Sequence, residues 1–354
     1  MKVETERFGQ TADGQDVFLY TFSCGQTVAR VMSLGATLVN LQVPSATGQL
    51  ESVVLHLDTL DDYLAGHPCF GSVCGRFANR IANGTFTLDG RTYTLAQNNG
   101  KNHLHGGREG FHQKVWRSEA IESNDFVGVK LSYTSPDGEE GYPGTLTASI
   151  TYKLSGNGRL ELAYEAVSDK STVLNLTNHT YWNLTGNRRD VLDHTLYVNA
   201  DHYLAVDSGL IPTGEILPVA GTPFDFTDRE HAHTIGERIN QTTVGNPPEP
   251  SGGYDHCFCL NKAPNRQAEC TLVAHACDPQ SGRKLTVFST EPGVQLYTTN
   301  GMNRKGAMEQ TYKNHWGFCL ELQHYPDSPN KPSFPSVVLR PGETYRQQTI
   351  YAFH

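Results

Sequence analysis

The sequence of 354 residues lacks an apolar run of about 18 residues, the length that a membrane-spanning helix needs. Its opening, MKVETERFGQ, also lacks the apolar stretch of a secretory signal peptide. We therefore expect no membrane partner and no export. Sequons of the type N-x-S/T point the same way, because three of them fall in one polar segment, NLTNHTYWNL (175–184), where glycans would cover any binding groove. These observations predict a cytoplasmic protein.

Cysteine is sparse for a chain of this length, with eight residues, and several lie inside apolar stretches that resemble strands. Free thiols are commonly buried in this way, whereas disulfide frameworks belong to small exported domains. We expect the cysteines to be reduced.

Basic residues are outnumbered: 28 Lys and Arg stand against 37 Asp and Glu, for a formal net charge of −9, and no Lys or Arg block occurs. A phosphate backbone or an anionic membrane surface would need a basic patch. The composition excludes nucleic acid as the main partner and favours a small neutral molecule.

Signatures of nucleotide and serine-hydrolase sites are also missing. The sequence has no GxGxxG, GxSxG or HExxH, and the nearest approach to a phosphate loop, Gly301 to Gly306, continues into Ala307 where a lysine is required.

Metal-site spacing is incomplete as well. Fifteen histidines are present, and the pairs His103/His105 and His231/His233 could each share a strand face, but neither pair has a third spaced ligand. No CxxC occurs. We expect neither a metal nor another cofactor.

Short stretches rich in Val, Leu, Thr, Tyr and Phe fill the chain between Gly, Pro, Asn and Asp clusters, the pattern of many antiparallel strands. The clearest hairpins are TFTL-DG-RTYTL (85–95) and TASITYKL-SGNG-RLELAYEAV (147–167). Further strands are expected at 17–22, 27–32, 37–43, 126–134, 195–200, 270–276, 284–289, 294–299, 317–322 and 344–351. Helices are scarce, with candidates only at 59–64 and 229–240.

The domain organisation follows from this pattern. The only linker-like stretch is NPPEPSGG (246–253), and the strand pattern continues beyond it without a change in composition. The sequence therefore predicts one large antiparallel β-sandwich, a single all-β domain over residues 1–354 with few short helices.

Polar side chains inside strand-like, aromatic segments mark the candidate site, because burying them costs about 1–3 kcal/mol each unless they are hydrogen-bonded. Glu321 stands between apolar neighbours in FCLEL, so burial would raise its pKa toward a value suited to a general base. An equally simple interpretation is a strand glutamate on the solvated face or paired with Arg. His179 lies in NLTNHTYWNL and could equally be a core histidine with one hydrogen bond.

Two further groups have structural alternatives. Arg80 and Asp255 could form an ion pair, and His105 precedes two glycines and could simply belong to a turn. Taken together, a carboxylate, an imidazole and surrounding Arg, Asn, Asp and aromatic groups suit a neutral polyhydroxylated ligand, of which a sugar is the natural example.

Eight motifs carry a resemblance to a known family. They are GRFANRI, LHGG, DGEEGYPG, NLTNHTYWNL, PTGE with GTPFDF, TEPGVQLYT, GFCLELQHYPDSPN and FPSVVLRPGETY. In this order they closely resemble the aldose 1-epimerases, also called galactose mutarotases, over nearly the whole chain.

The resemblance implies the family's fold, a large antiparallel β-sandwich, and its reaction, the interconversion of the α and β anomers of D-galactose, D-glucose and related hexoses without a cofactor. Glu321 matches the general base and His179 the general acid. The positions that match sugar contacts are Asn79, Arg80, His105, Tyr181, Asp255 and Gln295, and His105 also matches a group near the ring oxygen.

Two other functions stay open at this point. A glycoside hydrolase would use two carboxylates, for which Glu321 and Asp255 are candidates. A non-catalytic carbohydrate-binding protein would use the same groove without proton transfer. A phosphorylated sugar is disfavoured as substrate, because the matched site supplies only one obvious arginine.

Overall fold

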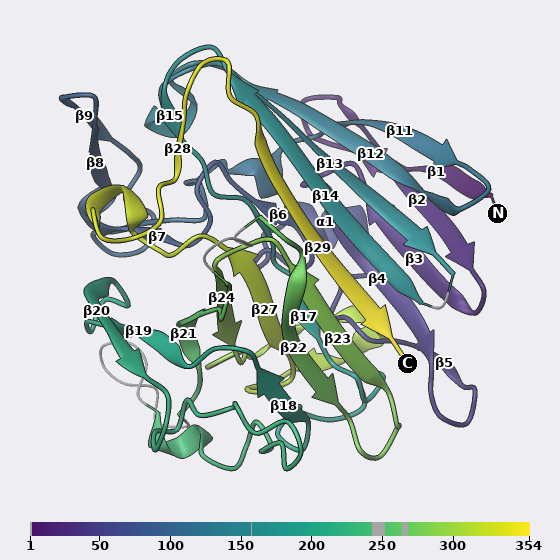
Figure 1. The fold of residues 1–354 in the computed structure, drawn as a ribbon. Coiled ribbons are helices and arrows are strands. Elements are labelled where there is room, and N and C mark those ends of the chain that lie inside the picture. The colour runs from purple at the N-terminus through teal and green to yellow at the C-terminus, as the bar shows by residue number, and fades with distance from the viewer. Residues whose placement is uncertain (1, 157, 243–251, 264–267) are drawn as a thin grey trace.

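The computed structural model describes residues 2–156, 158–242, 252–263 and 268–354, and antiparallel strands dominate these ranges (Figure 1). The longest α-helix in them is α1 (Leu60–Leu64), which Thr59 caps by accepting a hydrogen bond from the backbone N–H of Asp62. No helix within the described ranges has the length and apolar character needed to cross a membrane.

One layer of the molecule is an eight-stranded antiparallel sheet whose long central strands run side by side in Figure 1. In spatial order its strands are β11 (Arg117–Glu122), β12 (Phe126–Ser135), β13 (Leu146–Ser155), β14 (Arg159–Ser168), β29 (Tyr345–Phe353), β23 (Lys284–Ser289), β22 (Thr271–Cys277) and β18 (Thr195–Val198).

The opposing layer combines two sheets. The N-terminal sheet has the order β1 (Val3–Gln10), β2 (Asp16–Cys24), β3 (Thr27–Met32), β4 (Thr37–Pro44) and β5 (Leu50–Ser52). The six-stranded sheet has the order β17 (Tyr181–Trp182), β27 (Phe318–Gln323), β24 (Gly293–Tyr297), β21 (Asp255–Cys259), β19 (His202–Val206) and β20 (Pro212–Pro218). A bridge between Val54 and Trp182 joins the two sheets.

Short strand pairs and 3₁₀ turns lie in the segments between the strands of the large sheets. The pairs are β7 (Arg80–Ile81) with β10 (His103–Leu104), β6 (Val73–Cys74) with β16 (Thr177–Asn178), β8 (Thr85–Leu88) with β9 (Arg91–Thr94), β15 (Thr172–Val173) with β28 (Val338–Leu339), and β25 (Arg304–Lys305) with β26 (Thr311–Tyr312). The 3₁₀ turns are Ala82–Gly84, Phe111–Gln113, Glu139–Gly141, Ile239–Gln241, Ala307–Glu309 and Ser328–Asn330.

The core lies between the layers because strand residues alternate in the direction they face. Along β13, every second side chain from Leu146 to Leu154 is buried and the intervening ones reach the outer face. The largest buried cluster includes side chains from Tyr20 near the start of the chain to Phe353 near its end, and the rings of Trp182 and Tyr351 meet across the layers at 4.7 Å.

The structure confirms the predicted antiparallel β-sandwich and both predicted hairpins. In the first hairpin, Asp89 and Gly90 both take positive φ angles, as a tight two-residue turn requires. The helix predicted near residues 59–64 is confirmed as α1. The linker-like stretch at 246–253 lies mostly outside the described residues.

The helix predicted at 229–240 is wrong. Ile235 and Ile239 are both buried in the core, but the backbone N–H of Ile235 donates to His194 and that of Gly236 donates to Leu192. The segment is therefore an irregular loop that hydrogen-bonds to residues 192–194 and buries its two isoleucines. The spacing of four residues between them does not reflect a helical repeat.

Candidate active site

A cavity of about 380 Å³ opens where the six-stranded sheet meets the short strands β7 and β10. Seven of the eight site residues predicted from the sequence line this cavity: Asn79, Arg80, His105, His179, Tyr181, Asp255 and Glu321. These residues come from segments far apart in the sequence, so the fold alone brings them together.

Glu321 is placed by the alternation of β27. Phe318, Leu320 and Leu322 face the core, and Glu321 faces the cavity on the other side of the strand, opposite Gln295 of β24. The Glu321 side chain is only 3% exposed. Its Oε2 makes no hydrogen bond to any described residue, so this buried carboxyl group is left with an unused acceptor.

His179 lies between β16 and β17, and two neighbours fix its ring. The ring stacks on that of Tyr181 at 4.8 Å, and the Tyr181 hydroxyl in turn donates to the carbonyl of Pro68. On the edge away from Glu321, Nδ1 lies 3.5 Å from the Sγ of Cys319. The ring therefore presents Nε2 to the cavity.

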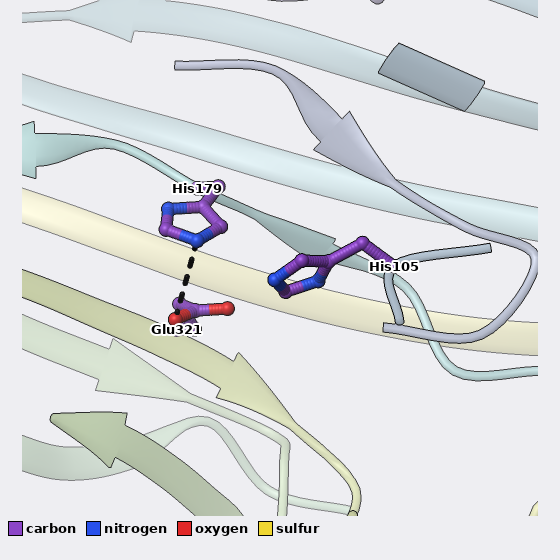
Figure 2. Close-up of side chains that lie close together, drawn as sticks. All are labelled: His105, His179 and Glu321. Carbon is purple, nitrogen blue, oxygen red and sulfur yellow. Dashed lines mark ion pairs between the residues drawn. The ribbon is translucent and has the colours of Figure 1, made fainter. Parts of the chain in front are cut away.

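Glu321 and His179 face each other across the cavity floor, as Figure 2 shows, with 3.6 Å between His179 Nε2 and Glu321 Oε1. Burial, assisted by the charge of Asp255, raises the pKa of Glu321 well above its ordinary value of 4.5. Burial also lowers the pKa of His179 to about 4. The pair thus holds a proton acceptor and a proton donor at close range in a dry environment.

His105 is the third member of this cluster, with its ring centroid 5.1 Å from that of His179. The backbone N–H of Asn79 donates to His105 Nδ1 at 3.2 Å. Burial keeps the ring neutral by lowering its pKa well below 6.5, so its single proton must sit on Nε2. His105 therefore presents a hydrogen-bond donor, its Nε2–H group, to the cavity.

This tautomer bears on metal binding. Ligand atoms of His105, His179 and Glu321 lie within 4.8 Å of one another, a spacing that could surround a cation. A metal ligand must offer a lone pair, but the free ring nitrogen of His105 carries a proton because Asn79 occupies the other nitrogen. The three residues do not fit a metal centre in this arrangement.

Arg80 and Asp255 form the opposite wall and pair at 3.4 Å. Arg80 also donates from Nε to Asn99, and Asp255 accepts from the side chain of Gln295 at 2.6 Å. Gln295 is the one nominated residue outside the cavity lining; it lies behind Asp255 and holds it in place. Its Oε1, like Glu321 Oε2, has no hydrogen-bond partner among the described residues.

Other lining residues were not singled out in the sequence. They are Pro68, Cys69, Asn98, Leu104, Gly107, Arg108, His112, Gln113 and Tyr297. Tyr297 lies in the TEPGVQLYT motif and Arg108 directly follows LHGG, so proximity to a motif was an available signal for both. The cysteine and proline carry no such signal, because nothing in their local sequence predicts a cavity.

Comparison with known proteins identifies the relatives of this chain. The family described as Aldose 1-epimerase matches residues 19–352. The chain is 44% identical over 326 residues to the galactose mutarotase of Homo sapiens, covering 91% of this chain and 90% of that protein. It is 36% identical over 348 residues to the aldose 1-epimerase of Escherichia coli (strain K12), covering 96% of each.

Solved structures agree with the sequence relatives. The aldose epimerase homologue from C. elegans superposes with a TM-score of 0.85 at 29% identity, covering 95% of this chain and 98% of that chain. The galactose 1-epimerase from Lactobacillus acidophilus NCFM also gives a TM-score of 0.85, at 28% identity, covering 100% of this chain and 98% of that chain.

Proposed function

Because the chain belongs to the aldose 1-epimerase family and is an isomerase that interconverts the anomers of a sugar, we propose that Glu321 and His179 perform the two proton transfers of that reaction. The observation that carries this assignment is the 3.6 Å approach of His179 Nε2 to Glu321 Oε1 on the cavity floor. We propose D-galactose, D-glucose and related hexoses as substrates.

Ring opening requires a proton to leave the C1 hydroxyl and another to reach the ring oxygen. Glu321 accepts the first proton as general base, and His179 donates the second as general acid. The C1–O5 bond then breaks and C1 becomes an aldehyde. Rotation about C1–C2 presents the other face of the aldehyde, and reversal of both transfers closes the opposite anomer. Each acid or base of this kind contributes about 10²–10⁴-fold to the rate.

One shared proton is enough for this cycle. Burial favours the uncharged state of the pair, with the proton on Glu321, whereas catalysis starts with the proton on His179. The two states contain the same number of protons and differ only by a transfer between the facing atoms. Hydroxyl groups of a bound sugar compensate the charged state, because they replace the solvation that burial removes.

The remaining wall residues hold the sugar. Arg80 and Asp255 offer paired donors and acceptors to hydroxyl groups, and Asn79 and Tyr181 add polar and aromatic surface. His105 donates from Nε2, which suits an oxygen that gains negative charge, such as the ring oxygen as the C1–O5 bond breaks. Gln295 acts through Asp255.

A glycoside hydrolase is less well supported. Its second carboxyl group would be Asp255, but Gln295 already binds one of its oxygens and Arg80 the other. An acid catalyst needs a free proton to give to the leaving oxygen. The contacts of Asp255 therefore suit a group that accepts hydrogen bonds and not an acid catalyst.

We also propose that residues 1–354 form one domain, because the largest core cluster extends from Tyr20 to Phe353. The partner we propose is a free aldohexose, with neither nucleic acid nor membrane, because the composition is acidic and has no basic block. We propose a cytoplasmic location because glycans on the sequons at Asn175, Asn178 and Asn183 would cover the site.

Polarimetry of freshly dissolved α-D-galactose and α-D-glucose tests the proposal. The protein should accelerate the approach to anomeric equilibrium, and it should release no galactose from methyl α-D-galactoside. Release from the glycoside would support a hydrolase. Sugar binding with no acceleration would support a non-catalytic carbohydrate-binding protein.

A further inference from the structure

Arg108 is a cation in the wall of the catalytic cavity that has no partner carboxylate. The other arginine of the cavity, Arg80, is neutralised by Asp255 at 3.4 Å. Within the described ranges Arg108 forms no ion pair, and its guanidinium makes a single weak contact, 3.4 Å to the carbonyl of Gln97. The charge of Arg108 is therefore available to a ligand.

The acidic groups near this loop are already engaged. Glu109, next in sequence, pairs with Lys114, and Lys114 also pairs with Glu139. Glu140 accepts a hydrogen bond from the backbone N–H of Glu109. Because these carboxylates are engaged elsewhere, none of the described ones lies within hydrogen-bonding distance of the Arg108 guanidinium.

The backbone that presents Arg108 is rigidly held. The side-chain amide of Asn98 donates to the carbonyls of Leu104 and Gly107, and that of Gln113 donates to the carbonyl of Arg108. Gly107 has a φ of +111°, and the carboxylate of Glu140 occupies the space that a side chain would need there. The backbone position of Arg108 is thus fixed, whereas its exposed guanidinium can turn toward a ligand in the cavity.

We propose that this cavity also accepts aldoses that carry an anionic group, either a carboxylate or a phosphate, and that Arg108 binds the anion while C1 lies at Glu321 and His179. A guanidinium matches both anions because it offers parallel N–H donors to two oxygens. This rests on the proposed function and extends its substrate class beyond neutral hexoses. It revises the expectation that a phosphorylated sugar is disfavoured, because Arg108 is a second arginine in the cavity wall.

The test measures catalysed anomer exchange by NMR for D-galactose, D-galacturonate and D-galactose 6-phosphate, with the uncatalysed exchange subtracted. The readout is the ratio of kcat/KM for each anionic sugar to kcat/KM for galactose. Arg108→Gln should lower this ratio about threefold to fivefold at low salt, as expected for an exposed charge. Arg117→Gln removes an exposed arginine outside the cavity and should leave the ratio unchanged. Arg108→Lys should retain part of it.

A drop for one anionic sugar alone would identify carboxylate or phosphate as the group that Arg108 binds. An equal ratio in wild type, Arg108→Gln and Arg117→Gln would overturn the proposal, as would a wild-type enzyme that accelerates galactose and neither anionic sugar. A protein that accelerates none of the three sugars would instead contradict the proposed function.

A salt titration of the wild type gives a second measurement that does not depend on a variant folding. The Debye length is about 10 Å at 0.1 M salt, so KM for the anionic sugars should rise with added chloride while KM for galactose should not. The same salt response for all three sugars would contradict a role for Arg108.

Discussion

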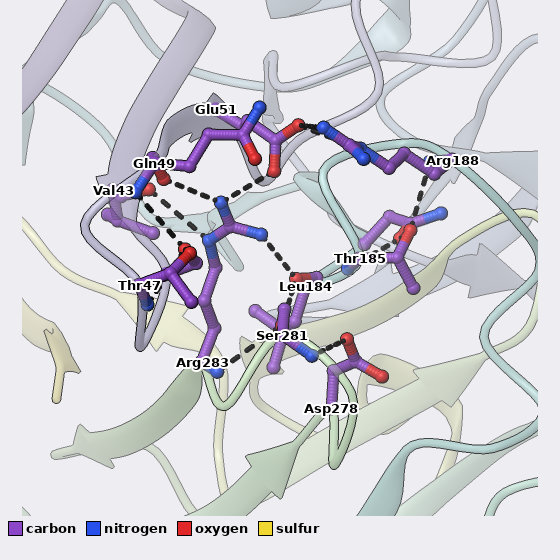
Figure 3. Close-up of polar contacts among 12 residues, drawn as sticks. Val43, Thr47, Gln49, Glu51, Leu184, Thr185, Arg188, Asp278, Ser281 and Arg283 are labelled. Carbon is purple, nitrogen blue, oxygen red and sulfur yellow. Dashed lines mark hydrogen bonds and ion pairs between the residues drawn. The ribbon is translucent and has the colours of Figure 1, made fainter.

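Arg283 and Glu321 are both charged residues buried in this molecule, but their surroundings differ. Arg283 is 1% exposed and donates to the carbonyls of Val43, Leu184 and Gln49 and to the carboxylate of Glu51, as Figure 3 shows. Glu321 is 3% exposed and leaves one carboxyl oxygen without a partner. Several other buried polar atoms of the described residues also lack a partner, but Glu321 Oε2 belongs to a carboxyl group in the cavity wall, where a bound ligand can complete the bonding.

The hydrogen bonds around Arg283 have a structural role, because they hold separate sheets together. Arg283 lies at the turn before β23 and donates to the carbonyl of Val43 in β4 and to that of Leu184, which follows β17, so one side chain links segments of three sheets. Although burial opposes it, hydrogen bonds from Arg283 and Arg188 lower the pKa of Glu51. The pair is thus charged, saturated and closed to other partners.

Replacing Arg283 by methionine should produce the largest effect on stability. It removes one donor from each of three carbonyls and from Glu51 Oε2, while Arg188 still pairs with Glu51 Oε1, and the loss costs about 3–5 kcal/mol of unfolding free energy. Urea unfolding measures the loss. Arg340→Met is the matched control, because its pair with Asp89 is exposed to solvent and its loss should change the free energy of unfolding far less. Equal losses in the two variants would remove the distinction between saturated and surface pairs.

His179→Gln should lower the catalysed rate and leave stability nearly unchanged, the opposite of the effect expected for Arg283→Met. It keeps a polar side chain but cannot deliver a proton to the ring oxygen, so kcat for galactose should fall by at least about 10²-fold. The urea midpoint should stay close to that of the wild type. An almost normal rate in folded protein would exclude His179 as the acid.

The sugar-holding residues should show a smaller effect that appears in KM. Arg80→Ala, His105→Ala and Asp255→Ala each leave a sugar hydroxyl without its partner, and KM should rise about tenfold in at least two of the three. Steady-state kinetics on galactose and glucose measure this. If all three variants bind sugar normally, the ligand does not lie against this wall.

The pH dependence of the rate should show the shared proton of the catalytic pair. Catalysis needs one proton on the pair, and the second is added as the pH falls toward about 4, where His179 titrates. The catalysed rate should therefore be nearly constant across weakly acidic pH and fall toward pH 4. A rate that already halves near the ordinary pKa of 6.5 would show that His179 is not buried as described.

Much of the fold could be predicted because strand alternation is local. The hairpin of β13 and β14 follows from its pattern, whereas β1 and β11 were missed because their edge positions leave most side chains exposed and polar. The motif GRFANRI contains two arginines, but only Arg80 reaches the cavity. Arg76 is buried against the carbonyls of Ser135, Pro136, Pro143 and Gly144, a saturated role that no local pattern distinguishes.

Glu321 stood out because a carboxylate in an apolar strand is locally visible, but the roles proposed for Glu321 and His179 came from the resemblance to a family and not from the local pattern. The position of Arg108 beside the LHGG motif was visible in the sequence, but its lack of a nearby acid was not, because that is a property of the folded cavity.

Glu321→Gln provides the most direct test, with catalysed galactose exchange and urea unfolding measured on the same protein. Glutamine keeps the shape of the side chain but accepts no proton, so the rate should fall by at least about 10²-fold. Stability should match or exceed that of the wild type, because the variant no longer buries an ionisable group. Since the folded state raises the pKa of Glu321, wild-type stability declines as the pH rises above 4.5, and the difference in favour of the variant should grow over that range. Near-normal exchange by the folded variant would exclude Glu321 as the general base, and a large loss of stability would show that its role is structural.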